Sequence, residues 1–179
     1  RFYTIGCETL PRGRGQGEPV RLLVGLGNDH EMVDLLIYKP NQKLLVAASD
    51  GRGFIVSEDE VIAQTRSGKQ VLNVSNKVEA CACSVLPENS DSVAVVGENH
   101  KMLVFPLQDV SEMSRGRGVK LQSYKDGGLS DVKVFNFFDG LVWKTGQRTR
   151  RETNLQDWLG KRAQFGRLAP KGFSRLNKF

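Results

Sequence analysis

Apolar residues in this chain occur in short runs, and the runs are separated by turns rich in Gly, Pro, Asn and Asp. Short apolar runs between such turns are typical of β-strands, so the pattern predicts an all-β protein. The polar stretch 57–60 predicts a capped turn, and only residues 155–159 show helix-like apolar spacing. The predicted strands cover residues 1–5, 33–38, 43–48, 54–56, 71–74, 81–85, 92–96, 101–105, 129–135 and 140–143.

The predicted strands recur with a fixed period. Residues 65–74 (TRSGKQVLNV) match residues 113–122 (MSRGRGVKLQ), and residues 49–56 match residues 97–104 at the same offset of 48. A strand-rich repeat of this size corresponds to one four-stranded blade of a propeller-type fold. We therefore predict a single domain over residues 1–179 with about four blades, at approximately 1–32, 33–80, 81–128 and 129–179.

Each repeat carries a short basic loop that contains glycine, which we call the box. The boxes are RGRGQGEP (12–19), RSGKQV (66–71) and RGRGVK (115–120), and residues 166–173 are a candidate for an altered copy. Arginine offers phosphate a planar fork, lysine offers a point charge, and glycine allows close approach of the backbone N–H groups. The boxes therefore predict contacts to phosphate, and the candidate residues are Arg12, Arg14, Arg66, Lys69, Arg115, Arg117 and Lys120.

Charge is distributed unevenly along the chain. The formal net charge is +6, but residues 144–179 contain ten Lys/Arg and two Asp/Glu, while residues 1–143 contain 16 basic and 18 acidic residues. A basic tail together with basic loops on a near-neutral body indicates a polyanionic partner, nucleic acid first. Two interpretations of Arg148, Arg150 and Arg151 stay open, because they could contact DNA or simply form an exposed hairpin face.

The sequence contains no catalytic or metal-binding constellation that we can recognise. His30 and His100 are single histidines in predicted turns, and the three cysteines fit neither a disulfide framework nor a zinc site. Cys81 and Cys83 are two residues apart, so on a regular strand they would share one face as reduced core thiols. No apolar run approaches the ~18 residues of a membrane-spanning helix. We expect a domain without enzymatic activity, cofactor or metal of its own.

The repeated strands and boxes resemble the C-terminal domain of the A subunits of bacterial type IIA topoisomerases, which are DNA gyrase and topoisomerase IV. The resemblance implies a β-pinwheel, a propeller-like disc whose blades exchange strands and whose rim binds and bends duplex DNA. No box matches the fuller Gln-Arg-Arg-Gly-Gly-Lys-Gly sequence of gyrase, whereas residues 16–19 and the ending 166–179 resemble topoisomerase IV. Such domains usually have about five blades, so the length of 179 residues leaves an open arc as one outcome.

The resemblance also implies a function and a set of partners. The domain would hold the transported duplex and tune relaxation and decatenation in a cytoplasmic, nucleoid-associated enzyme. Double-stranded DNA, the parent subunit dimer and the ATPase (B) subunit would be its partners, with no membrane involved. Tyr3, Tyr38 and Tyr124 lie in predicted blade strands, so the catalytic tyrosine, the ATP site and the Mg²⁺ site would lie outside this chain. The sequence starts at Arg1 without Met, so we expect a fragment of a longer protein.

Two alternatives remain open. One is the DNA-wrapping domain of the gyrase A protein, which shares the same fold. The other is a propeller that binds proteins, because acidic residues also lie near the boxes. These residues are Glu58, Asp59, Glu60, Asp109 and Glu112.

Overall fold

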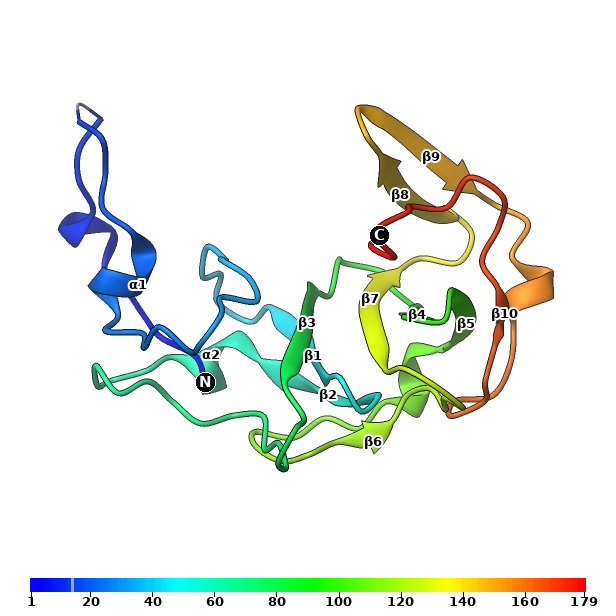
Figure 1. Cartoon of the computed structure of the whole chain (residues 1–179), viewed down its shortest axis with the longest axis horizontal. Helices are drawn as coiled ribbons and strands as arrows, with labels where there is room; N and C mark the ends of the chain where they lie inside the picture. The colour runs from blue at the N-terminus through cyan, green and yellow to red at the C-terminus, as the bar shows by residue number, and fades with distance from the viewer. Residues whose placement is uncertain (14) are drawn as a thin grey trace.

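Antiparallel sheets dominate the computed structural model, which describes residues 1–13 and 15–179 (Figure 1). The first sheet has the strand order β3-β1-β2-β6, and the second has the order β10-β5-β4-β7. A third, two-stranded sheet pairs β8 (Leu141–Thr145) with β9 (Arg148–Glu152). The strands of the two large sheets are β1 (Lys43–Ala48), β2 (Arg52–Ser57), β3 (Ala80–Val85), β4 (Ser92–Gly97), β5 (Lys101–Pro106), β6 (Val119–Lys120), β7 (Leu129–Phe135) and β10 (Arg167–Leu168).

Helical structure is limited to single turns in the described residues. Ser57 caps α2 (Glu58–Val61) because its hydroxyl accepts a hydrogen bond from the Asp59 N–H at 3.3 Å, as the polar stretch predicts. The helix-like residues 155–159 form only a short 3₁₀ turn. No helix in the part of the chain that the structure describes is long and apolar enough to span a membrane. The other turns are α1 (Val20–Leu23), η1 (Cys7–Thr9), η2 (Leu107–Asp109) and η3 (Gln156–Trp158).

The sequence repeat corresponds to a repeat of hairpins, each completed by strands from later in the chain. The β4–β5 hairpin begins 49 residues after the β1–β2 hairpin, at Ser92 instead of Lys43. In the first sheet the outer strand β6 pairs with β2, with Val119 opposite Gly53, although the whole β4–β5 hairpin lies between them in sequence. The second sheet repeats this arrangement, because β10 pairs with β5 and Arg167 lies opposite Met102. Each sheet is therefore a blade whose outer strand belongs to the next repeat.

Both faces of each large sheet are buried, which explains why their strands read as continuous apolar runs. Leu45 and Ala47 of β1 point into a cluster shared with β4, β5 and β7 of the second sheet. The alternating residues Leu44 and Val46 pack on the other face, against Phe2 and the N-terminal segment. A third cluster joins the second sheet to β8 and the C-terminal tail, and it contains Ala94, Met102, Val104, Phe135, Leu141, Trp143 and Leu155.

The N-terminal segment does not form the strands that the pattern predicts. Residues 33–38 are irregular, and the side chains of Leu35 and Ile37 are 66% and 83% exposed. No strand in the described ranges pairs with this segment, so its apolar pattern is not sufficient to make it a strand. The predicted strands 1–5 and 71–74 reduce to single bridged residues, Phe2 opposite Lys69 and Leu72 beside Gly116. In Figure 1 the first part of the chain, in blue, rises as an arm away from the sheets.

Three glycines allow the outer segments to lie against the hairpins. Gly68, Gly118 and Gly166 have φ values of +72°, +77° and +75°, which side-chain-bearing residues rarely adopt. A Cβ atom on them would lie 2.8 Å from the Phe2 carbonyl oxygen, 2.1 Å from that of Gly53 and 2.3 Å from that of Met102, respectively. We refer to the surrounding residues, 67–71, 117–121 and 165–169, as the closing segments.

We expect Gly118→Ala to destabilise the protein by roughly 3 kcal/mol, because it combines a left-handed backbone with overpacking against Gly53. Gly146→Ala is the matched control, since Gly146 has φ +61° but no atom within 4 Å of the added Cβ. That control should lose only about 1 kcal/mol. Urea unfolding measures both changes, and equal losses would show that contact with Gly53 is unimportant.

The thiols of Cys81 and Cys83 pack on opposite faces of β3, and not on one face as a regular strand would place them. Cys81 packs against the cluster between the two large sheets, and Cys83 packs against the cluster on the N-terminal side. The register between β1 and β3 shifts at Ala47/Ala48, opposite residues 80–82, and this bulge turns the strand over. Burial raises the pKa of each thiol to about 12.

This burial predicts selective thiol labelling at pH 8. Cys7 is exposed and should react quickly with iodoacetamide, whereas Cys81 and Cys83 should react slowly, because the reactive thiolate is scarce. Mass spectrometry over time should show one fast site in the native protein and three in denaturant. Rapid labelling of three sites in the native protein would contradict this packing.

Candidate nucleic-acid interface

Two closing segments lie at equivalent positions on the outer edges of successive hairpins, and the first closing segment lies in the same way against Phe2. Lys69 pairs with Phe2 through two backbone hydrogen bonds of 2.7 and 2.9 Å, and Val119 and Arg167 occupy the same position against Gly53 and Met102. Arginine side chains reinforce two of these contacts. Arg1 Nη1 donates to the Ser67 carbonyl at 3.2 Å, and Arg52 Nη1 lies 3.4 Å from the Gly118 carbonyl.

Successive closing segments are also hydrogen-bonded to the chain that leads into the next one. The Gly116 N–H donates to the Val71 carbonyl at 3.0 Å, and the Asn73 N–H donates to the Gly116 carbonyl at 2.7 Å. The next junction repeats this pattern, because the Ala163 N–H donates to the Leu121 carbonyl at 2.9 Å. The three segments therefore form one continuous edge, which we call the rim.

Three of the seven predicted cations, Lys69, Arg117 and Lys120, lie on this rim, and Arg66 and Arg115 lie just before its first two segments. Arg66, Arg115, Arg117 and Lys120 are exposed, and Lys69 is half-buried beside Phe2. The neighbouring acid Asp50 lies close to only one of them, with Arg117 Nη2 3.7 Å from Asp50 Oδ2 while the Arg117 side chain stays 56% exposed. The rim therefore presents cationic side chains to solvent.

The other two predicted cations belong to the first box. Arg14 lies outside the described residues. Arg12 is exposed on the N-terminal arm, in the loop before α1, and no hydrogen bond among the described residues links this loop to the rim. The structure thus groups the second and third boxes and leaves Arg12 apart from them.

Arg167 is the cation of the third closing segment, and it was not predicted from the sequence. It lies on β10 directly after Gly166 and is exposed, with Asp157 3.9 Å away and itself largely exposed. The signal was present, because Gly166 follows Gly118 by 48 residues and begins the altered box at 166–173. Arg162 instead has a structural role, since its Nη1 donates to the Lys120 carbonyl at 2.6 Å.

Two glycines of the third box have roles in the fold. The Gly116 N–H is bonded to the Val71 carbonyl, and Gly118 lies against Gly53. A backbone group that is satisfied within the sheet is not free for a ligand, so the Gly116 N–H is not available to an anion.

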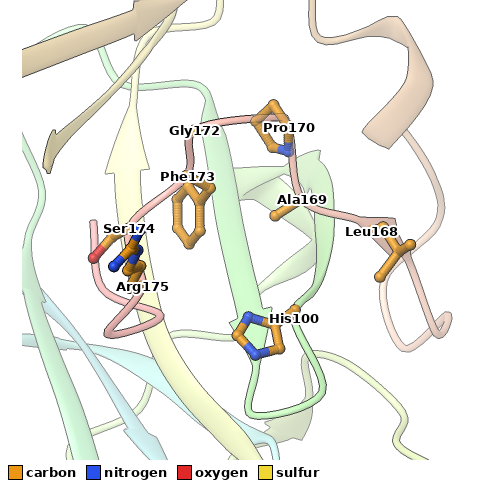
Figure 2. A pocket seen from close by; sticks show the side chains of 8 residues that line it. All are labelled: His100, Leu168, Ala169, Pro170, Gly172, Phe173, Ser174 and Arg175. Carbon is orange, nitrogen blue, oxygen red and sulfur yellow. The ribbon is translucent and has the colours of Figure 1, made fainter.

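A hollow of about 290 Å³ lies on the side of the C-terminal tail and is lined by eight residues (Figure 2). Figure 2 shows His100 on the turn between β4 and β5, with Phe173, Ser174 and Arg175 on the tail. No carboxylate or thiol lines this hollow, so His100 has no acidic partner there for acid–base chemistry. Within the described ranges, no group of three His, Cys, Asp or Glu residues could hold a metal ion.

Known proteins share this arrangement. The sequence profile of a family described as "DNA gyrase C-terminal domain, beta-propeller" matches residues 42–82 and 91–134. The whole chain is 45% identical to part of the A subunit of DNA topoisomerase 4 from Rickettsia bellii and 42% identical to part of the same protein from Caulobacter vibrioides. It spans 24% and 23% of these relatives, about a quarter of their length.

A solved structure extends the comparison to three dimensions. The E. coli ParC C-terminal domain matches with a TM-score of 0.79 and 28% identity, over 97% of this chain and 74% of that one. Strand-exchanging blades with a cationic rim define the chain as a β-pinwheel domain. Two stretches of it match the DNA gyrase C-terminal domain family, and the relatives that match its full length are topoisomerase IV A subunits. The fold class and the family expected from the sequence are both confirmed.

Proposed function

We propose that this domain binds duplex DNA along the rim and bends it, without catalysing a reaction itself. The observation that carries the proposal is the hydrogen-bonded continuity of the three closing segments, which arranges cations from separate repeats along one edge. Duplex DNA presents closely spaced phosphates and releases counterions when basic side chains neutralise them. A row of exposed arginines and lysines suits that backbone better than it suits a compact anion.

The curvature of the blade array supports bending of the bound duplex. The sheets follow one another around an arc in Figure 1, and β6 and β10 lie on their outer edges. A duplex that contacts successive outer edges has to follow this arc. The energy of such contacts depends on DNA deformability more than on base sequence, because the rim contributes flexible cationic side chains.

The role in the parent protein follows from the family. The topoisomerase IV relatives support a domain that holds a DNA segment for a bacterial type IIA topoisomerase and so tunes relaxation and decatenation. In this proposal the catalytic tyrosine, the ATP site and the Mg²⁺ site lie in other parts of the enzyme. Its protein partners are the parent subunit dimer and the ATPase subunit, and it acts in the cytoplasm at the nucleoid.

Replacing Arg115 and Arg117 together by Gln should weaken binding to duplex DNA about tenfold at low salt. The plot of log affinity against log salt should become shallower by about 2, because two phosphate contacts are lost. Fluorescence anisotropy with a labelled duplex measures both quantities.

A matched control removes the same charge away from the rim. Lys39 is an exposed turn residue, and Lys178 contacts the carbonyl of Ser130 in β7, at the sheet edge opposite β10. The Lys39→Gln/Lys178→Gln variant should keep most of its affinity. If the two double variants lose the same affinity for DNA, binding depends only on net charge, and the rim is not a defined binding surface.

Asp50 should restrain DNA binding through Arg117. Asp50→Asn removes the carboxylate charge near Arg117 but keeps an oxygen to accept the Arg52 N–H. We expect two- to threefold tighter binding at low salt and no difference at high salt, where the exposed pair is screened. The gain should shrink when Arg117 is also replaced by Gln. Unchanged or weaker binding by Asp50→Asn would show that this pair does not compete with phosphate.

A further inference from the structure

The β8–β9 hairpin occupies the third position in the series of blade hairpins. β1, β4 and β8 begin at Lys43, Ser92 and Leu141, so the spacing of 49 residues is the same at both steps. The first two hairpins are each flanked by two further strands, whereas β8 and β9 pair only with each other in the described structure. Within the described residues, no closing segment therefore pairs with the outer strand of the third blade.

The inner side of this hairpin is occupied by the rest of the domain. Trp143 Nε1 and Thr145 Oγ1 donate to the Gly172 carbonyl at 3.2 and 3.3 Å, which holds the C-terminal tail over β8. Lys133 Nζ of β7 donates to the Val142 carbonyl at 2.7 Å. The outer strand β9 pairs with no further strand among the residues that the structure describes, and its residues 148–151 are all exposed. The Arg150 guanidinium lies against Gly172 of the tail, on the side of its cross-strand neighbour Trp143.

The exposed part of the hairpin carries only positive charge. Residues 144–151 contain Lys144, Arg148, Arg150 and Arg151 and no acidic residue. None of these four side chains forms an ion pair within the described part of the chain, and Arg151 Nη1 donates to the Asp139 carbonyl at 2.9 Å. Charged side chains on an edge strand can serve merely to block aggregation, which is the simpler explanation.

We propose that β9 contacts the same duplex as the rim, with Arg148 and Arg150 taking the place of a closing segment. The inference rests on the proposed function of the rim. β2, β5 and β9 follow in this order around the arc in Figure 1, so a duplex that leaves β10 continues toward β9. The arginine guanidinium binds phosphate and carboxylate oxygens alike in a bidentate geometry, so it is the position of β9 after the cationic rim that favours DNA over an acidic polypeptide strand at this edge.

Binding to duplexes of different length distinguishes contacts to the rim from contacts to β9. Arg148→Gln/Arg150→Gln should leave binding to short duplexes unchanged and weaken binding to longer duplexes about tenfold, with a salt dependence shallower by about 2. Arg151 stays intact because it holds the Asp139 carbonyl. The Lys39→Gln/Lys178→Gln variant, with the same loss of charge, should retain the dependence on length.

The outcomes distinguish failure of this inference from failure of the proposed function. If the Arg115/Arg117 variant binds every duplex with normal affinity, the rim does not bind DNA, and both the proposed function and the inference about β9 are wrong. If that variant is weakened at all lengths while the hairpin variant matches the wild type, only the inference about β9 is overturned. Self-association of the hairpin variant in light scattering, with DNA binding intact, would overturn it in favour of edge protection. Competition for β9 by an acidic peptide, without any effect of DNA length, would likewise overturn it.

Discussion

The backbone pairing between each closing segment and an earlier part of the chain, either Phe2 or the outer strand of a hairpin, determines the rest of this structure. These hydrogen bonds connect parts of the chain that are separated by a complete hairpin, as Gly53 and Val119 are. They require a glycine in a left-handed conformation at Gly68, Gly118 and Gly166, because a Cβ would collide with the facing carbonyl. Each contact places the side chains that follow the glycine on the outside of a blade.

The pairing of the closing segments also determines which strands are buried and which segments carry charge. The inner strands lose both faces to the apolar clusters, so the blades stack through Leu45, Val95 and Leu103 and carry little charge. The outer segments are short and exposed, and their residues vary between Lys69-Gln70, Val119-Lys120 and Arg167-Leu168. Of the cations at these positions, Lys120 and Arg167 are exposed and Lys69 is half-buried. An edge with this tolerance suits contact to a repetitive phosphate backbone more than recognition of a unique ligand.

Periodicity in the sequence was sufficient to predict the hairpins and the all-β class, and the family was predicted from the resemblance of the boxes. Periodicity wrongly predicted a strand at residues 33–38, because these residues have a strand-like pattern but no partner strand among the described residues. It also aligned Gly68 with Gly116, whereas the pairing of Lys69 and Val119 makes Gly118 the equivalent residue. Arg167 was not predicted because its surrounding sequence departs from the other boxes, although Gly166 keeps the 48-residue spacing, and the pairing of β10 places Arg167 beside Met102. Strand exchange is a long-range property that a local pattern does not encode.

Chemical footprinting of lysines tests most directly whether the rim is one DNA-binding edge. The protein would be acylated with and without duplex DNA, and the modified residues would be quantified by mass spectrometry. Lys69 and Lys120 lie on the closing segments, whereas Lys39 and Lys178 lie away from them. Our account predicts that DNA protects the first pair and leaves the second pair reactive. Protection of Lys39 and Lys178 with Lys69 and Lys120 unprotected would contradict it.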